Sequence, residues 1–223
     1  MRMARVFKVA IIIIIILIAS IVVLPVMFSQ YIIGTPLPAL ELPELNEADG
    51  NGVVPIPDGT WTVVSDSVAG FRIGEYFLLQ RGIMVGRTHA VTGLVDISSG
   101  TITSASFQVD LSKVVITINE KSNNLERVVD MINYPYATFE LSDPVDVTQL
   151  STDGQTVSSE AKGSLTINNI THHITFTLTG GYDGSQLAAT GSAAILLADW
   201  DIKSPFGIEN DAEIEFLVIL QKA

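Results

Sequence analysis

Strict alternation of apolar and polar side chains is the feature that most limits the folds open to this chain. In residues 105–111, ASFQVDL, the apolar Phe107, Val109 and Leu111 alternate with polar residues, and residues 174–180, ITFTLTG, repeat the pattern. Because successive side chains of a strand point to opposite faces, this period predicts half-buried antiparallel strands. Strands are expected near residues 60–65, 70–79, 84–97, 101–111, 136–142, 158–167, 172–182, 187–199 and 212–221.

Turn signals separate these runs. Ser99-Gly100, Asp153-Gly154, Asn168-Asn169 and Asp183-Gly184 are residue pairs that favour tight turns between antiparallel strands. Eight or nine strands must bury one face without leaving long bare edges, and closure into a barrel achieves this. A two-sheet sandwich fits the same alternation, so the pattern alone leaves both all-β architectures open.

One amphipathic helix is predicted among the strands. Residues 116–132 carry apolar side chains at helical spacing from Leu125 to Ile132, and Asn123 can cap the first turn. Pro135 ends the helix, because the residue before a proline disfavours the α region, and a strand follows at once. We expect this helix to plug or cover one end of a barrel.

The N-terminal residues predict a membrane anchor. Residues 9–28 contain no charged residue, and Arg2, Arg5 and Lys8 precede them. Twenty helical residues at about 1.5 Å each span roughly 30 Å, the thickness of the bilayer core. Since a basic flank favours the cytoplasmic side, we expect a single N-terminal transmembrane helix in the cell membrane and an extracytoplasmic C-terminal domain. A cleaved signal peptide is the alternative, although it favours a shorter apolar run.

The next residues predict a spacer. Residues 34–59 contain five prolines, several acidic residues and no basic residue. Proline favours extended backbone and like charges repel, so this composition is typical of a semi-rigid stalk. The expected organisation is a signal anchor in residues 1–30, a Pro-rich acidic stalk in 31–57 and a barrel domain in 58–223.

Net charge and residue types limit the function. Three of the 12 basic residues precede the apolar segment and all 24 acidic residues follow it, so the outer portion carries a net charge of −15. This charge argues against nucleic-acid binding. The chain has no cysteine, His172 and His173 are expected on opposite faces of one strand, and no hydrolase motif is present. We therefore predict no enzymatic activity, no metal and no cofactor.

The chain contains, in order, the segments GTWTV (59–63), SVAGFRIGE (67–75), VGRTHAVTGLVDI (85–97), ASFQVDLSKV (105–114), NYPYATFEL (133–141), GSLTINNITHHITFTLTG (163–180), DWDIKSPFGI (199–208) and EIEFLVIL (213–220). Taken together, these segments resemble the YceI-like family of extracytoplasmic lipid-binding barrels. The resemblance covers about residues 58–223 and implies an extended, eight-stranded, lipocalin-like antiparallel barrel with a long apolar interior. Such proteins are carriers of polyisoprenoids or other long-chain amphiphiles and are often dimeric, which leaves a homodimer open here.

The alternation also predicts which side chains face inward. Burial is worth about 0.8 kcal/mol per CH₂, so a ten-carbon tail could bind without any ion pair. Arg81, Arg87 and His89 are candidates for a polar head group at the barrel mouth. In the alternative, the inward side chains fill a dry core and the acidic surface docks an envelope protein. The predicted cavity wall is Phe71, Ile73, Phe107, Val109, Phe139, Leu141, Ile174, Phe176 and Leu178.

Overall fold

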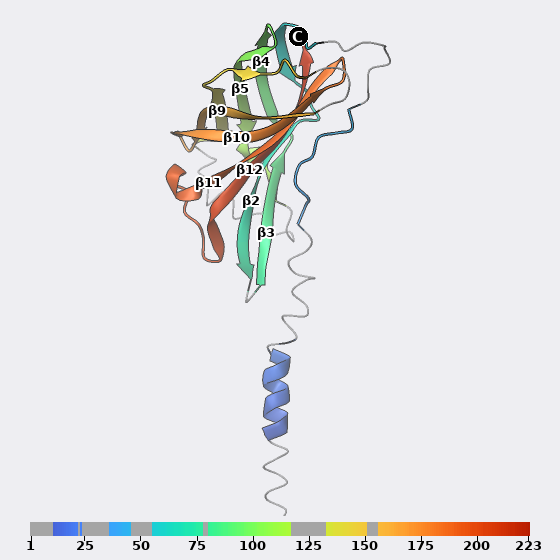
Figure 1. Cartoon of the computed structure of the whole chain (residues 1–223). Coiled ribbons are helices and arrows are strands. Elements are labelled where there is room, and N and C mark those ends of the chain that lie inside the picture. The colour runs from blue at the N-terminus through green and yellow to red at the C-terminus, as the bar shows by residue number, and fades with distance from the viewer. Residues whose placement is uncertain are drawn as a thin grey trace, which may run out of the picture.

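The computed structural model describes residues 11–21, 23, 36–45, 55–77, 80–116, 133–150 and 156–223 (Figure 1). Residues 11–21 are helical. Within these described ranges, no helix is both long enough and apolar enough to cross a membrane. The other residues of the predicted anchor at 9–28, apart from residue 23, lie outside the described residues. The predicted helix at 116–132 also lies outside them, except for Ile116, which belongs to a strand.

Strands make up most of the described chain. Two 3₁₀ turns interrupt them, η1 (Leu111–Lys113) and η3 (Leu197–Trp200). The strands are β1 (Gly59–Val63), β2 (Val68–Phe77), β3 (Gln80–Thr88), β4 (Val91–Ser98), β5 (Thr101–Asp110), β6 (Val115–Ile116), β7 (Tyr136–Leu141), β8 (Val145–Asp146), β9 (Val157–Ile167), β10 (Ile170–Tyr182), β11 (Gln186–Leu196) and β12 (Ile208–Lys222).

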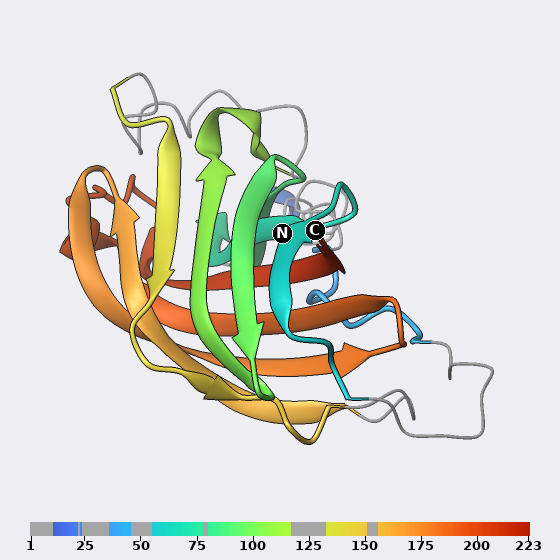
Figure 2. The same cartoon turned by 90° about the horizontal axis from the view of Figure 1, so that it is seen from above.

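Closure depends on β12, which pairs with two strands along one edge. Near its end Leu220 pairs with Val63 of β1, and earlier Ile214 pairs with Phe71 of β2. β1 and β2 therefore form one bent strand, and β3 and β4 form another beside it. The order β1-β4-β5-β7-β9-β10-β11-β12 returns to β1, so the predicted eight-stranded antiparallel barrel is confirmed and the sandwich alternative is wrong (Figure 2).

Most predicted strands match the structure to within a few residues, but two of them break or end inside the predicted run. The expected strand at 84–97 breaks after Thr88, because the Thr88 hydroxyl accepts a hydrogen bond from the Ala90 N–H at 3.0 Å and bends the chain. The expected strand at 187–199 ends at Leu196, where η3 begins. Asp199 therefore lies in a 3₁₀ turn, and Asp201 has a left-handed backbone (φ 53°).

Two of the predicted turns have the left-handed backbone conformation that their residue types favour. Ser99 and Gly100 both have positive φ, 52° and 73°, and so do Asn168 and Asn169, 51° and 60°. Two-residue turns of this kind match the twist of the flanking strands, and glycine and asparagine tolerate the left-handed region best. The Asp153-Gly154 pair lies outside the described residues.

Residues 36–45, which belong to the predicted stalk, lie along the outer face of the barrel. The Arg72 guanidinium donates a hydrogen bond to the Leu37 carbonyl at 2.8 Å, and Arg87 donates to the Pro38 carbonyl. We call residues 36–45 the strap, and Figure 1 shows it as a blue trace beside the strands. The described part of the expected stalk is therefore bound to the barrel instead of standing apart from it.

The strap continues across the sheet toward β10. The Thr190 hydroxyl on β11 donates a hydrogen bond to the Leu40 carbonyl at 3.1 Å. The Leu45 side chain lies against Gly181 of β10, in the space that a Cβ at Gly181 would need. The strap thus crosses from β3 and β2 to β10, and its backbone oxygens find donors on the barrel.

A buried ion cluster lies under the first strap residues. Glu215 of β12 is only 3 % exposed, and its carboxylate accepts from the Arg87 Nε at 2.8 Å. Arg72 approaches the other carboxylate oxygen at 3.9 Å. Glu215 pairs with Gly70 in the register, whereas its neighbours Ile214 and Phe216 line the interior. The cluster therefore lies on the outer face of the barrel.

We expect Glu215→Ala to lower the free energy of unfolding by about 3 kcal/mol, because it leaves two partly buried arginines without their carboxylate. Urea unfolding followed by tryptophan fluorescence measures the change. Glu213→Ala is the matched control, since Glu213 is an exposed outward residue of the same strand and its loss should cost less than about 0.5 kcal/mol. Equal effects of the two variants would contradict the role of the cluster.

Candidate functional site

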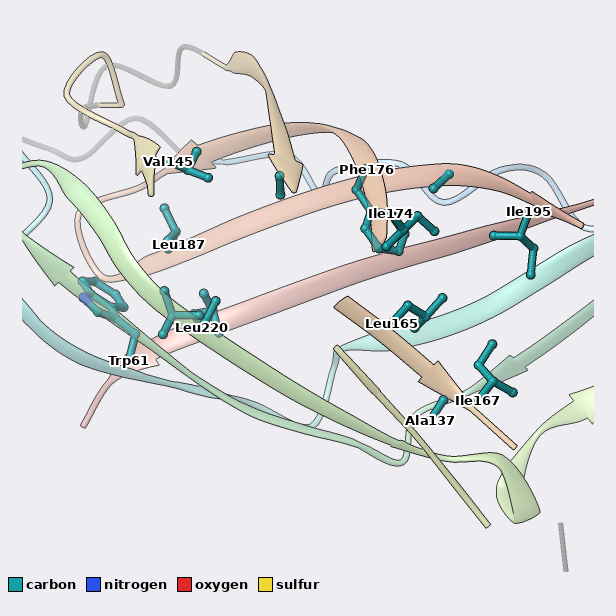
Figure 3. Packing of buried hydrophobic residues seen from close by; sticks show 14 of the residues in the cluster. Trp61, Ala137, Val145, Leu165, Ile167, Ile174, Phe176, Leu187, Ile195 and Leu220 are labelled. Atoms are coloured by element: carbon teal, nitrogen blue, oxygen red, sulfur yellow. The ribbon is translucent and has the colours of Figure 1, made fainter. Parts of the chain in front are cut away.

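The barrel encloses an elongated apolar cavity of about 260 Å³. Side chains from β2, β4, β5, β7 and β9 to β12 line it. In Figure 3, Trp61, Leu187 and Leu220 lie toward one end of the core and Ile167 and Ile195 toward the other. The core is therefore hollow, which contradicts the alternative of a filled barrel.

Aromatic rings form the middle of the wall. Phe176 packs edge-to-face against Phe139, with ring centroids 5.4 Å apart, and against Phe216 at 5.3 Å. Edge-to-face contacts stabilise aromatic pairs beyond the area that they bury. These three residues come from β7, β10 and β12, so the aromatic contacts connect strands that are not neighbours in the sheet.

Four of the cavity phenylalanines lie against a glycine of an adjacent strand. A Cβ built on any of these glycines would come closer than 3.0 Å to an atom of the facing ring. Glycine therefore lets each ring occupy the space of a missing side chain, along the wall instead of across the lumen. The pairs are Phe71 with Gly86, Phe107 with Gly93, Phe139 with Gly163 and Phe216 with Gly191.

We expect Gly86→Ala to push the Phe71 ring into the lumen, because the new Cβ would lie 2.5 Å from that ring and meets only side chains. Binding of the apolar fluorophore N-phenyl-1-naphthylamine should weaken about threefold or more. Gly180→Ala is the control, since a Cβ at this cavity-wall glycine has ordinary contacts from 3.4 Å outward. Unchanged binding by Gly86→Ala, or equal loss in both variants, would contradict this account.

The structure places eight of the nine predicted wall residues on the cavity. Ile174 is the exception, because it is buried in the core but does not line the cavity. Contact of these side chains with a ligand stays a prediction. The eight lining residues are Phe71, Ile73, Phe107, Val109, Phe139, Leu141, Phe176 and Leu178.

The three predicted head-group residues do not line the cavity. Arg81 binds Glu209 through two hydrogen bonds of 2.8 Å, which raise the pKa of Arg81 and lower the pKa of Glu209. Arg87 binds Glu215 on the outer face. His89 is exposed, and its Nδ1 lies 3.1 Å from the Ser67 carbonyl. The structure therefore does not bring the three together at the cavity.

Sequence reasoning named no wall residue from β4, β9, β11 or β12, although all four strands line the cavity. Ile214, Phe216, Val218 and Leu220 of β12 line the cavity. They alternate along EIEFLVIL, so the same period-2 signal could have identified them. β11 carries no such signal, because small residues occupy both of its faces in QLAATGSAAIL.

Carboxylates contribute little to the interior. Asp146 is exposed at the edge of the wall, and its Oδ1 accepts hydrogen bonds from the hydroxyl and the N–H of Thr148 at 2.6 and 2.8 Å. These bonds lower the pKa of Asp146. The other acidic residue of the wall, Glu215, faces outward and is paired. The lumen is therefore suited to an uncharged, apolar occupant.

Glu75 on β2 is the acidic residue that burial affects most clearly: desolvation raises its pKa above the usual value. As the pH rises from about 4, the unfolded chain loses this proton before the folded chain does, so the ionised group reduces stability at neutral pH. We expect Glu75→Gln to raise the melting temperature at pH 7 and to leave it unchanged below about pH 4.

Thermal unfolding at both pH values tests this expectation. Glu160→Gln, at an exposed position of β9, is the matched control and should not change the melting temperature at either pH. A gain for Glu75→Gln that is equally large at low pH would show that the effect does not come from ionisation.

Histidines and acidic residues form no metal centre in the described ranges. No group of three or more metal-ligating side chains is present there. His172 Nε2 lies 2.9 Å from the Asp199 carbonyl, and His173 Nδ1 lies 3.4 Å from the Ser164 hydroxyl. These contacts are local hydrogen bonds on the barrel surface.

Known proteins share this architecture. A family model described as "YceI-like domain" matches residues 61–220. A polyisoprenoid binding domain from Saccharophagus degradans, implicated in plant cell wall breakdown, is 13 % identical and has a TM-score of 0.56; the match covers 75 % of this chain and all of that one. BcnA from Burkholderia cenocepacia is 16 % identical, with a TM-score of 0.56 and coverage of 70 % and 98 %.

A third solved structure, the YCEI protein of Campylobacter jejuni, is 14 % identical with a TM-score of 0.51, and the match covers 62 % of this chain and 84 % of that one. No curated protein matches the sequence. At these identities the structural likeness establishes the fold alone.

Proposed function

Because the chain belongs to the YceI-like domain family, we propose that its barrel holds a polyisoprenoid or a similar long-chain lipid in the central cavity. The observation that carries this proposal is the hollow, apolar lumen inside a closed barrel. The polyisoprenoid-binding domain of Saccharophagus degradans supports the choice of ligand, since it shares the fold.

Affinity would come from burial of the apolar chain. At about 0.8 kcal/mol per CH₂, ten carbons contribute roughly 8 kcal/mol, from which the cost of immobilising ligand and protein is subtracted. The phenylalanine rings offer wide apolar surfaces, and the glycines behind them leave the lumen open for the chain. No ion pair is needed for such binding, and no catalytic step is proposed.

We further propose that the protein is tethered to the cell membrane by its N-terminal apolar segment, with the barrel outside the cell membrane. The uncharged run at residues 9–28 and the basic residues before it support this placement. Tethering would keep the carrier beside the bilayer that supplies its ligand. A homodimer stays a prediction.

Mass spectrometry of organic extracts from the purified full chain tests the ligand. We expect a co-purifying long-chain lipid, and Ala161→Leu should reduce its amount about threefold or more, because Ala161 lines the lumen. Ala194→Leu is the matched control, since Ala194 is exposed on the outside of β11 and should not alter the bound lipid.

Two results would contradict the proposal. One is reproducible absence of lipid from the wild-type extract, together with failure of the protein to bind added polyprenol. The other is an equal lipid content in the Ala161→Leu and wild-type proteins, because a ligand outside the lumen would be insensitive to that change.

A further inference from the structure

One aromatic side chain of the barrel is completely exposed. Phe206 lies in residues 201–207, the loop between η3 and β12, and the surrounding structure covers none of its side chain. Tyr76, near the end of β2, is about half exposed and lies next to this loop. Covering the Phe206 ring with another apolar surface would be favourable, by about 25 cal/mol for each Å² of apolar area removed from water.

Backbone hydrogen bonds hold the loop in this position. The Tyr76 N–H donates to the Gly207 carbonyl at 2.6 Å, and the Ile208 N–H donates to the Pro205 carbonyl at 3.0 Å. Gly207 is thus held to β2, and Pro205 is held to the first residue of β12. The structure presents the ring outward on a defined support.

The same loop also reaches the cavity. Ile202, four residues before Phe206, is buried and lines the lumen, as does Leu197 in the preceding turn. The exposed ring and this end of the cavity wall are therefore parts of one short segment. A surface that covered Phe206 would lie next to one end of the lumen.

The charged residues near Phe206 would not attract an anionic membrane surface. Arg81 is neutralised by Glu209 through two hydrogen bonds, and Lys203 stands near Asp201 in the sequence. The chain after residue 28 carries a net charge of −15. Attraction to this end would come from the apolar rings and not from basic residues.

The strap brings the N-terminal part of the chain to the same region. Leu37 is bound by Arg72, which lies four residues before Tyr76 on β2, a distance of about 13 Å along a strand. The first strap residues therefore lie over β2 and β3, and β2 is the strand that carries Tyr76. Without the strap contacts, the chain between residues 28 and 58 could extend to about 110 Å, whereas the part from 28 to 37 reaches at most about 32 Å.

We propose that Phe206 and Tyr76 form a docking surface for a zwitterionic lipid bilayer, with the Phe206 ring in the membrane interface. Aromatic side chains favour this interfacial region. Docking would bring the Ile202 end of the cavity close to the bilayer, which gives an apolar ligand a short path from membrane to lumen. This inference depends on the proposed tethering, but it does not require that the lumen hold a polyisoprenoid.

Site-specific fluorescence on the full chain tests the docking surface. The chain has no cysteine, so Phe206→Cys provides a single site for an environment-sensitive nitrobenzoxadiazole label. Ser185→Cys is the matched control, because Ser185 is exposed in the β10–β11 turn, at the opposite end of β11 from η3. Both variants are reconstituted in phosphatidylcholine vesicles that contain lipids with a nitroxide near the head group.

We expect the label at 206 to be quenched at least about twofold more than the label at 185, and its emission to shift to the blue. Equal quenching at the two positions would overturn the docking surface. Replacing a third of the phosphatidylcholine with phosphatidylglycerol should not increase quenching at 206. An increase would show that charge, not apolar insertion, drives the contact.

Vesicle flotation and a second variant separate this inference from the proposed function. Full chain that fails to float contradicts tethering, whereas floating chain with an unquenched label at 206 contradicts docking alone. In unlabelled protein, Phe206→Ser should slow the transfer of N-phenyl-1-naphthylamine from vesicles to the barrel about tenfold, with unchanged affinity in solution. Unchanged transfer would overturn the role of Phe206 in ligand uptake.

Discussion

The backbone pairing of β12 is the interaction on which the rest of the structure depends. With 15 residues, this strand is long enough to pair with β11 on one side and with both β2 and β1 on the other. If it paired with one partner only, the sheet would keep two long edges, which tend to associate with other chains. Closure converts the apolar face of the sheet into an enclosed interior. The Glu215 side chain of the same strand points outward. The pairing register of β12 therefore determines both the position of the outer ion cluster and which side chains line the cavity.

Whether a closed barrel of this size is hollow depends on how its large side chains lie. Eight strands leave an interior that side chains can fill completely or that can hold one small ligand. Here the phenylalanines are placed against glycines of neighbouring strands, so that ring volume replaces missing side-chain volume at the wall. The cavity of about 260 Å³ is the consequence. Its apolar wall is the physical basis for assigning a lipid to this barrel.

The strap changes how the barrel relates to the N-terminal segment. Prolines and acidic residues in 36–45 are typical of a spacer, and they keep this backbone extended with free carbonyl oxygens. Arg72, Arg87 and Thr190 supply donors to those oxygens on the outer face. An extended segment with unpaired carbonyls is thus suited to lie across a sheet that offers side-chain donors. The number of residues between the apolar segment and the first contact with the barrel becomes smaller for that reason.

The sequence by itself determined the local features of this protein. Period-2 alternation identified most of the strands and placed Phe107, Phe139 and Phe176 on the inner face, because side-chain direction in a strand depends only on neighbouring residues. The turns at Ser99-Gly100 and Asn168-Asn169 could be predicted for the same reason. Alternation did not separate a barrel from a sandwich, since both bury one face of a sheet.

Only the tertiary structure decided closure, the hollow interior, the strap and the place of the arginines. The sequence suggests Arg87 as a residue that binds a lipid head group. In the structure, Arg87 instead pairs with Glu215 on the outside of the barrel, 128 residues away along the chain. The contacts of Phe71 with Gly86 and of Leu37 with Arg72 likewise depend on register and on the path of the chain around the barrel. Such pairings are set by the free energy of the whole closed sheet, and no short stretch of sequence contains both partners.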